Sequence, residues 1–433
     1  MGLPYTEARH LIKVEAQRQR VSQAQPCSTY NACDRIVAET ITSLISTPEY
    51  DTSAMDGFAL SSAATEIATP ETPVTFEVIG TTTAGDRPHS TADDLRDGIS
   101  PCVEIMTGAP FPLDDESEGF DCCVPIEEVV VSENKISNCR YISVSKPAKR
   151  RQHRRFAGGD FTKGDVIVEA GECIQPHHLM ALASVGVREV PVLRRPRVAV
   201  FSTGSELLES GGKSHQFMIP DANGPYLTSM LRKWGVDVDF RGVIADSQGT
   251  MEHAVQSALG DGYDLIVTSG AVSAGRCDII PGLIKRMGGR TVFHKVAVKP
   301  GHPVLFSMLP GEMGETAFFG LPGNPVAAAA CLRFFVLPYI QTLQLQRPEE
   351  PQIVTLRTSQ RTESCNGTKG DVLTFRKEPD IFRPAISRFS HVWIIEDHSP
   401  GKTKPFLQAD CWVHIPSGVS ELGAGSLVSI YPF

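Results

Sequence analysis

The sequence predicts a multidomain α/β plus β protein with a central doubly wound α/β domain. Three observations favour this fold class. The chain has 433 residues, more than a single hydrophobic core usually serves. Across residues 195–343, short apolar runs alternate with small-residue loops and helical stretches, as in a parallel α/β sheet. Residues 45–145 and 344–433 instead show short runs that alternate apolar and polar residues, which favours strands.

The N-terminal part is expected to be helical. Residues 5–21, and less cleanly 32–43, repeat apolar groups three and four positions apart. We assign residues 1–44 together with 146–194 to a discontinuous N-terminal helical linker domain. In its second part, "HHLMALASVGV" predicts a short helix that ends at Gly186, because glycine readily adopts the left-handed C-cap conformation.

The linker is expected to be interrupted by a mainly β inserted domain, residues 45–145. This segment is rich in Pro, Thr and Gly, and "VTFEVIG" and "DCCVPIEEVVV" are its clearest strand patterns. Residues 344–433 contain "QIVTLRT", "DVLTFRK", "CWVHIP" and "SLVSIYPF", which predict a small C-terminal β-barrel domain.

In the central domain, residues 195–343, the segments "RVAVF", "YDLIV" and "AFFG" are candidates for buried strands. The stretch "GPYLTSMLRKWG" predicts a helix closed by Gly235. Its apolar face carries Leu227, Met230, Leu231 and Trp234.

Composition narrows the classes of partner. The net charge of −9 argues against nucleic acid or an anionic membrane as the main ligand. The eleven cysteines include no C-x-x-C pair, which favours free thiols and a cytoplasmic protein. We expect no membrane span and no signal peptide. The basic run 146–155 is open to three interpretations: a solvated surface, an anion-facing rim or a nuclear-import signal.

Three loops follow the predicted strands: "STGSE" (202–206), "TSGAVSAG" (268–275) and "LPGNP" (321–325). Ligands of doubly wound sheets lie outside the carboxyl ends of the strands, and helix N-termini favour anions. Any one of these loops alone could be an ordinary connection between a strand and a helix. Three such loops at one edge of the sheet predict a phosphate-bearing ligand. The candidate residues are Ser202, Thr203, Gly204, Ser269, Gly270, Ser273, Gly275, Pro322, Gly323 and Asn324.

Charged residues flank these loops. Lys295 and Lys299, four apart, would point the same way on a strand, and they would either neutralise an anion or lie in solvent. Asp246 and Asp278 are expected near the same edge, either as Mg²⁺ ligands or as helix caps.

Several motifs occur together in order: "PEYDTSAMDGFAL", "EIMTGAPFP", "RVAVFSTGSEL", "IPDANGPYL", "SGAVSAGRCD", "VAVKPGHP" and "GLPGNPVAA". From about residue 28 to the C-terminus, the chain resembles the molybdopterin molybdenumtransferase family of the MoeA and gephyrin E-domain type. The resemblance implies a transferase that takes adenylylated molybdopterin and molybdate, releases AMP and leaves molybdenum on the dithiolene. It also implies a homodimer of elongated four-domain subunits, with the site between the molybdopterin-binding α/β domain of one subunit and the β domain of the other.

The resemblance carries over the family's functional residues one by one. The catalytic set would be Asp56, Thr107, Asp160, Glu206, Asp246, Asp278, Lys295 and Lys299. Pro300, Gly301 and Arg276 would join the substrate-binding loops, and Asp246 with Asp278 would hold Mg²⁺.

The sequence departs from the family pattern at four positions. Gly159 and Arg276 stand where an acid is usual, Ala271 replaces a glycine, and His302 replaces a lysine. These departures keep two alternatives open: a recruited paralogue that acts on another adenylylated or phosphorylated substrate, and a non-catalytic dimeric scaffold.

Overall fold

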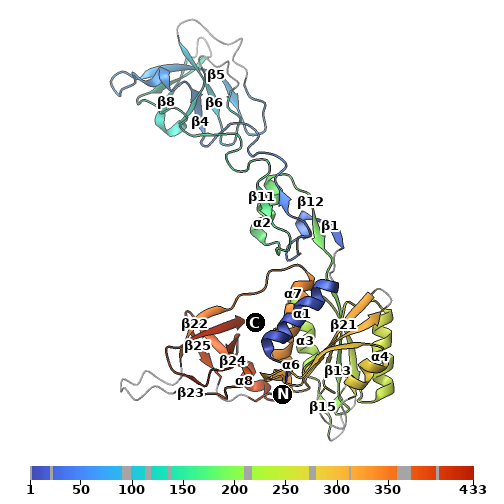
Figure 1. The fold of residues 1–433 in the computed structure, drawn as a ribbon. Helices are drawn as coiled ribbons and strands as arrows, with labels where there is room; N and C mark the ends of the chain where they lie inside the picture. The colour runs from blue at the N-terminus through green and yellow to red at the C-terminus, as the bar shows by residue number, and fades with distance from the viewer. Residues whose placement is uncertain are drawn as a thin grey trace.

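The computed structural model describes an elongated chain (Figure 1). Its described residues are 2–19, 23–89, 99–112, 119–134, 139–208, 217–272, 279–311, 314–357, 372–395 and 399–433. One β domain lies at one end, a narrow linker follows, and the α/β domain lies beside a second β domain at the other end.

The central α/β domain contains a six-stranded sheet in the order β16-β13-β17-β21-β20-β18. β13, β16, β17 and β21 run parallel, whereas β20 runs antiparallel between β21 and β18, so the sheet is mixed. The strands are β13 (Arg197–Thr203), β16 (Asp237–Ile244), β17 (Leu265–Ser269), β18 (Arg290–His294), β20 (Leu305–Gly311) and β21 (Gly314–Leu321).

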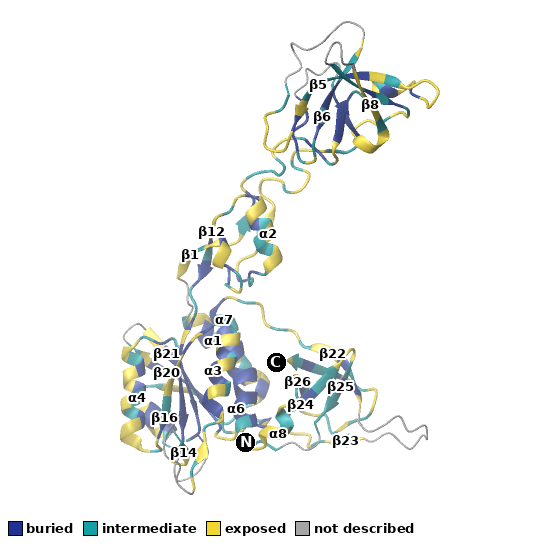
Figure 2. Cartoon of the chain, turned by 180° about the vertical axis from the view of Figure 1, so that it is seen from behind, coloured by how far each residue is buried: buried dark blue, intermediate teal, exposed yellow. Residues whose placement is uncertain are grey.

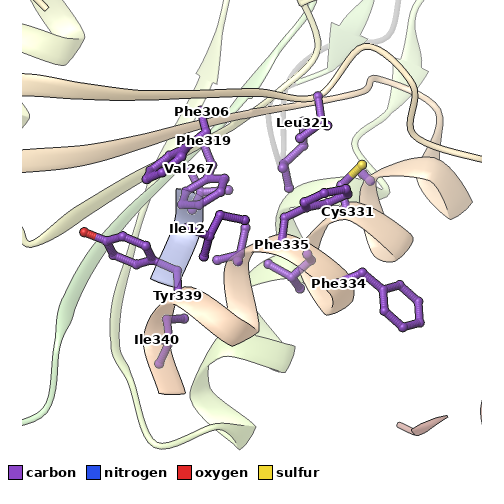
Figure 3. Packing of buried hydrophobic residues seen from close by; sticks show 14 of the residues in the cluster. Ile12, Val267, Phe306, Phe319, Leu321, Cys331, Phe334, Phe335, Tyr339 and Ile340 are labelled. Atoms are coloured by element: carbon purple, nitrogen blue, oxygen red, sulfur yellow. The ribbon is translucent and has the colours of Figure 1, made fainter. Parts of the chain in front are cut away.

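Helices cover both faces of this sheet, as a doubly wound fold requires. One face packs against α1 (Tyr5–Gln19), α3 (Asn223–Lys233), α6 (Pro325–Cys331) and α7 (Leu337–Leu343), and the other against α4 (Gln248–Gly260) and α5 (Ile280–Arg286). Figure 2 shows the buried residues gathered in the strands and the helices on them. At the centre of the first face, Phe306 stacks on Phe319 with ring centroids 4.4 Å apart, close to Ile12 of α1 (Figure 3).

The helical run Pro325–Leu343 joins α6 to α7 through the π-helical turn η4 (Leu332–Val336). By length and composition alone this run is long and apolar enough to cross a membrane. Its most apolar window is 89% buried inside the protein, however, so its apolar side chains are explained by packing against the sheet.

The linker is built mainly from short strands, and the helix predicted over 32–43 is wrong. β1 (Ala24–Ser28) pairs with β12 (Glu189–Leu193), and β2 (Ile41–Thr42) pairs with β11 (Val166–Val168). Ile36 and Val37 form bridges to residues of the second linker segment, and this tertiary pairing overrides the weak helical period. The remaining linker elements are η1 (Thr29–Asn31) and α2 (Pro176–Ser184).

Two further linker predictions have clear outcomes. α2 forms as expected, and Gly186 follows its C-cap with φ +77°. α1 is helical as expected, but it packs against α7 and the central sheet rather than in the linker.

The inserted domain is a six-stranded sheet in the order β7-β4-β6-β5-β9-β8, so its described part is mainly β as predicted. The chain enters and leaves the inserted domain at neighbouring positions. Thr47 N–H donates to Phe161 O at 2.8 Å, and Asp160 N–H donates to Thr47 O at 2.9 Å. Its elements are β3 (Thr52–Ser53), β4 (Gly57–Leu60), η2 (Ala63–Thr65), β5 (Val74–Thr82), β6 (Ser100–Ile105), β7 (Cys122–Pro125), η3 (Ile126–Glu128), β8 (Val129–Asn134), β9 (Cys139–Val144) and β10 (Arg154–Arg155).

The C-terminal domain is a closed five-stranded barrel, which confirms the predicted barrel. β22 (Gln352–Arg357), β24 (Asp380–Arg388), β25 (His391–Ile394), β26 (Cys411–Ile415) and β28 (Leu427–Pro432) pair around its circumference. β19 (Val298–Lys299) of the central domain pairs with β24 and ties the two domains together. The remaining short elements are β14 (Leu207–Leu208), β15 (Ile219–Pro220), β23 (Leu373–Thr374), α8 (Thr403–Phe406) and β27 (Glu421–Leu422).

Candidate functional site

The loops after β13, β17 and β21 meet at the carboxyl edge of the central sheet. Parallel pairing puts their starting points side by side, as the sequence pattern predicts. Thr203 Oγ1 donates to Ser269 O at 2.9 Å, and Gly270 N–H donates to Leu321 O at 2.8 Å. The later part of the β17 loop, with Ser273, Gly275, Arg276 and Asp278, lies outside the described residues.

The loops after β13 and β21 both approach the β17 loop at Gly270. Its φ is +101°, and an added Cβ would lie 2.6 Å from Thr203 Oγ1 and also against the Thr203 carbonyl. A Cβ on Gly323 would lie 3.6 Å from the Gly270 Cα. A side chain at position 270 would therefore push the loops apart.

Gly270→Ala is expected to reduce the free energy of unfolding by about 2–4 kcal/mol, because strain at positive φ adds to the overlap with Thr203. Gly262→Ala is the matched control, since Gly262 has φ +70° but open space around its Cβ position. The control should lose only about 1–2 kcal/mol. Urea unfolding followed by circular dichroism gives both values, and equal losses would contradict a steric role for Gly270.

Buried polar atoms without partners gather at this edge. Ser202 Oγ, Thr268 Oγ1, Ser269 Oγ and Asp246 Oδ1 are buried and have no hydrogen-bond partner among the described residues. Buried polar atoms in folded proteins are nearly always hydrogen-bonded, so each unpaired one needs an explanation. A polar ligand at the carboxyl edge would supply the missing partners.

Two carboxylates lie close together beside the unpaired hydroxyls. Asp246 follows β16, and its N–H donates to Ser205 Oγ at 3.2 Å, which brings it to the loop that carries Glu206. Burial, and next the negative charge of Glu206, raise the pKa of Asp246. A cation between the two carboxylates would relieve this repulsion. Among the described residues, no three His, Cys, Asp or Glu side chains form a metal cluster by themselves.

The two predicted lysines do not share a strand, and that prediction is wrong. Lys295 follows β18 with φ +72°, which breaks the strand, and Lys299 lies on β19 beside the barrel. The segment that carries both lysines still lies at the carboxyl edge. The end of β18 pairs with the start of β20, which in turn pairs with the end of β21. His302, where the family pattern has a lysine, has Nδ1 2.7 Å from Val296 O and so lies inside the same loop.

Lys299 lines a cavity of about 190 Å³ between the α/β domain and the barrel, together with Pro300, Val326 and Arg383. Burial lowers the pKa of Arg383, and its Nε has no hydrogen-bond partner among the described residues. Sequence reasoning missed Arg383, because β24 carries none of the family motifs. Two cationic side chains around a small cavity suit a compact oxyanion.

A second group of predicted residues lies in the inserted domain. Thr107 donates to Asp56 Oδ1 from its N–H at 2.6 Å and from its hydroxyl at 2.8 Å. These hydrogen bonds, the backbone one first, lower the pKa of Asp56, so the exposed carboxylate stays ionised. Two residues picked out only by family resemblance are therefore direct partners.

The basic run borders this second group. β10, within the run, pairs with β3 just before the Asp56 loop, and Ala54 N–H donates to His153 O at 2.8 Å. Arg154 Nε forms an ion pair with Asp51 at 2.6 Å within the same domain. Asp160 is exposed near the junction with the linker, and no described contact joins it to Asp56.

The two groups lie in domains at opposite ends of the elongated molecule (Figure 1). Asp246, Glu206 and Lys299 are on the α/β domain, and Asp56 with Thr107 is on the inserted domain beyond the linker. A single chain therefore does not assemble all the predicted site residues in one place.

Fold and site together define a class of multidomain protein, in which an α/β domain with glycine-containing loops at its carboxyl edge is joined through a linker to a distant β domain. Residues 3–186 match the MoeA N-terminal region (domain I and II), and residues 199–342 match the probable molybdopterin binding domain. The molybdopterin molybdenumtransferase of Synechococcus elongatus is 31% identical over 92% of this chain and 91% of the relative. The protein of the same name from Haemophilus influenzae is 30% identical over 95% and 94%.

The crystal structure of the molybdopterin biosynthesis MoeA protein from Pyrococcus horikosii superposes with a TM-score of 0.78 at 26% identity, covering 100% of this chain and 99% of that one. The chain belongs to the molybdopterin molybdenumtransferase family, and it is a transferase of molybdenum cofactor biosynthesis.

Proposed function

We propose that this protein inserts molybdenum from molybdate into adenylylated molybdopterin. In this reaction water adds across the phosphoanhydride bond and AMP leaves. The two dithiolene thiols lose their protons and replace two oxo ligands of molybdate, which leave as water. The observation that carries the proposal is the convergence of unpaired hydroxyls, two adjacent carboxylates and cationic side chains at one sheet edge. An anionic ligand with several oxygens would bind the hydroxyls and the cationic side chains directly, and the carboxylates through a bound cation.

Each group has a defined task in the proposal. Backbone N–H groups of the glycine loops, with Ser202 and Ser269, hold the phosphate oxygens of the substrate. Lys299 and Arg383 bind molybdate in the cavity beside the barrel, and Lys295 offsets the charge of the phosphates. The compact cavity of about 190 Å³ admits an oxyanion but is too small for the whole pterin substrate.

Mg²⁺ fits the carboxylates of Asp246 and Glu206, because the unpaired Asp246 Oδ1 and the repulsion between the two groups both call for a cation. Mg²⁺ commonly binds through one or two carboxylates together with substrate phosphates. There it would neutralise charge on the pyrophosphate. Asp278 remains a proposed further ligand outside the described residues.

We propose a homodimer for the complete site, with the Asp56–Thr107 group of one subunit facing the α/β edge of its partner. The separation of the two groups in one chain supports this arrangement. We place the protein in the cytoplasm, where its nine described cysteines, all free, would stay reduced.

Light scattering at micromolar concentration is expected to give about twice the 47.0 kDa of the chain, because a site shared between subunits requires a closed two-fold assembly. A monomer over the whole concentration range would contradict a shared site.

The function is tested by expressing this chain in a strain that lacks its own molybdenum insertase and measuring molybdoenzyme activity. Purified protein given adenylylated molybdopterin and molybdate should release AMP, with Lys299→Gln as the impaired variant. AMP release without restored molybdoenzyme activity would mean that the nucleotide is cleaved without molybdenum insertion, and it would contradict the proposed insertion step. Failure of both would contradict the proposal.

A further inference from the structure

A second cavity lies at the opposite, amino-terminal edge of the central sheet, where the linker joins the α/β domain. Its volume is about 490 Å³, within the range of small-molecule sites. Arg195 lies just before β13 and Gly235 just before β16, so the cavity faces away from the substrate loops. The linker contributes Arg35, and the helical run after β21 contributes Arg333.

The wall of this cavity is cationic. Arg35, Arg195, Arg232, Lys233 and Arg333 line it, against two acidic side chains, Asp34 and Glu349. Glu349 and Arg333 pair at 2.6 Å and offset each other, Arg195 lies 4.0 Å from Asp237, and Lys233 donates to Phe433 O at 2.9 Å. Arg35 donates to the Leu193 carbonyl at 3.0 Å and Arg232 to the Val238 carbonyl at 3.4 Å, neither of which neutralises charge. The cavity therefore favours an anion.

Two almost fully buried polar side chains in the wall have unpaired atoms. Arg333 is 6% exposed and its Nε has no partner among the described residues, and Gln344 is 3% exposed with Oε1 unpaired. The Nε of the half-exposed Arg195 is also unpaired. Arg333 lies on the π-helical turn η4, a distortion that is frequent at functional sites. The two arginine Nε atoms are donors that an anionic ligand in the cavity would satisfy.

The rest of the wall is apolar and includes Trp234, Leu337, Ile340 and Phe433. We propose that this cavity is a second ligand site, distinct from the substrate edge, for a small organic anion with a flat apolar part. The anionic group binds through the unpaired Nε atoms of Arg333 and Arg195, near the uncompensated charges of Arg35 and Arg232, and the flat part packs against Trp234. Because the wall includes residues of both the linker and the α/β domain, an occupied site holds the two domains in one relative orientation.

The test uses 1-naphthyl phosphate as probe and tryptophan fluorescence as readout, since Trp234 lies in the wall. Saturable quenching is expected for the full-length protein, and Trp234→Phe should remove most of the signal. Arg333→Gln and Arg195→Gln should each weaken binding by about tenfold or more, as expected for the loss of a charged hydrogen bond. Arg195→Gln keeps the test decisive if loss of the buried Arg333 prevents folding.

Three controls separate the alternatives. Neutral 1-naphthol should bind at least about tenfold more weakly than the phosphate. Arg197→Gln removes an arginine that lies over Tyr263 outside the cavity, and it should leave binding unchanged. Lys299→Gln disables the proposed substrate edge and should also leave binding unchanged. The proposal is overturned if the probe does not saturate, if Arg195→Gln binds like the unaltered protein, or if Lys299→Gln abolishes binding.

Discussion

Asp246→Asn is expected to lower AMP release by about 100-fold or more, the usual loss when a group that stabilises developing charge is removed. The same change should leave the ligand-free protein at least as stable at neutral pH. Burial and Glu206 raise the pKa of Asp246, so the folded state binds this proton more tightly than the unfolded chain. Stability from this group is therefore present at low pH and is lost as pH rises from the unfolded value toward the raised pKa. Asparagine carries no charge to repel Glu206.

The two effects are measured separately, by chromatography of released AMP and by thermal unfolding of ligand-free protein at pH 7. Asp237→Asn is a matched control, because Asp237 begins the strand that Asp246 follows and is largely exposed. It should change neither quantity appreciably. A lower unfolding temperature in Asp246→Asn would mean that this carboxylate supports the fold, and undiminished AMP release would contradict its role in the site.

Mixed dimers are expected to recover activity that either parent lacks. Asp56→Asn and Asp246→Asn homodimers should both be inactive. Co-expressed subunits should recover about a quarter of full activity, since half of the dimers are mixed and each has one intact site. The recovery follows because Asp56 and Asp246 would come from different subunits at each site.

Differently tagged subunits, co-expressed and assayed for AMP release, give the result directly. The control pairs Asp56→Asn with Thr107→Val. Thr107 donates to Asp56 within one chain, so both changes leave the sheet edge intact and damage the same half of the site. In mixed dimers of these two variants, each site still has one damaged Asp56–Thr107 group, and no recovery is expected. Recovery in the control, or none in the test pair, would contradict a shared site.

Sequence periodicity predicted the helices and strands whose local apolar pattern matches the conformation that tertiary packing requires. β13, β17 and α3 combine strong apolar patterns with flanking glycines, and they form where expected. Residues 32–43 carry a weak helical period, and pairing with distant linker strands decides their conformation. The strand β24 was missed, although it pairs with both β25 and β26 to close the barrel.

The site was predictable where a motif follows a parallel strand, because strand direction alone brings such loops together. The proximity of Asp246 to Glu206 depends on contacts between two loops, which no spacing in the sequence encodes. The failure at Lys295 arose from a left-handed backbone in the middle of an apparent strand. The place of Arg383 in the cavity could not be predicted, because it depends on the contact between two domains rather than on a sequence pattern.

The backbone pairing of Thr47 with Phe161 makes the inserted domain a self-contained insertion in the linker. Both of its ends leave the linker at neighbouring positions, so its removal or exchange leaves a gap that a short turn can bridge. The linker, the α/β domain and the barrel keep their own apolar cores in such a chain. Recombination at this point can therefore exchange the inserted domain for a different β domain while the carboxyl edge of the α/β sheet stays unchanged.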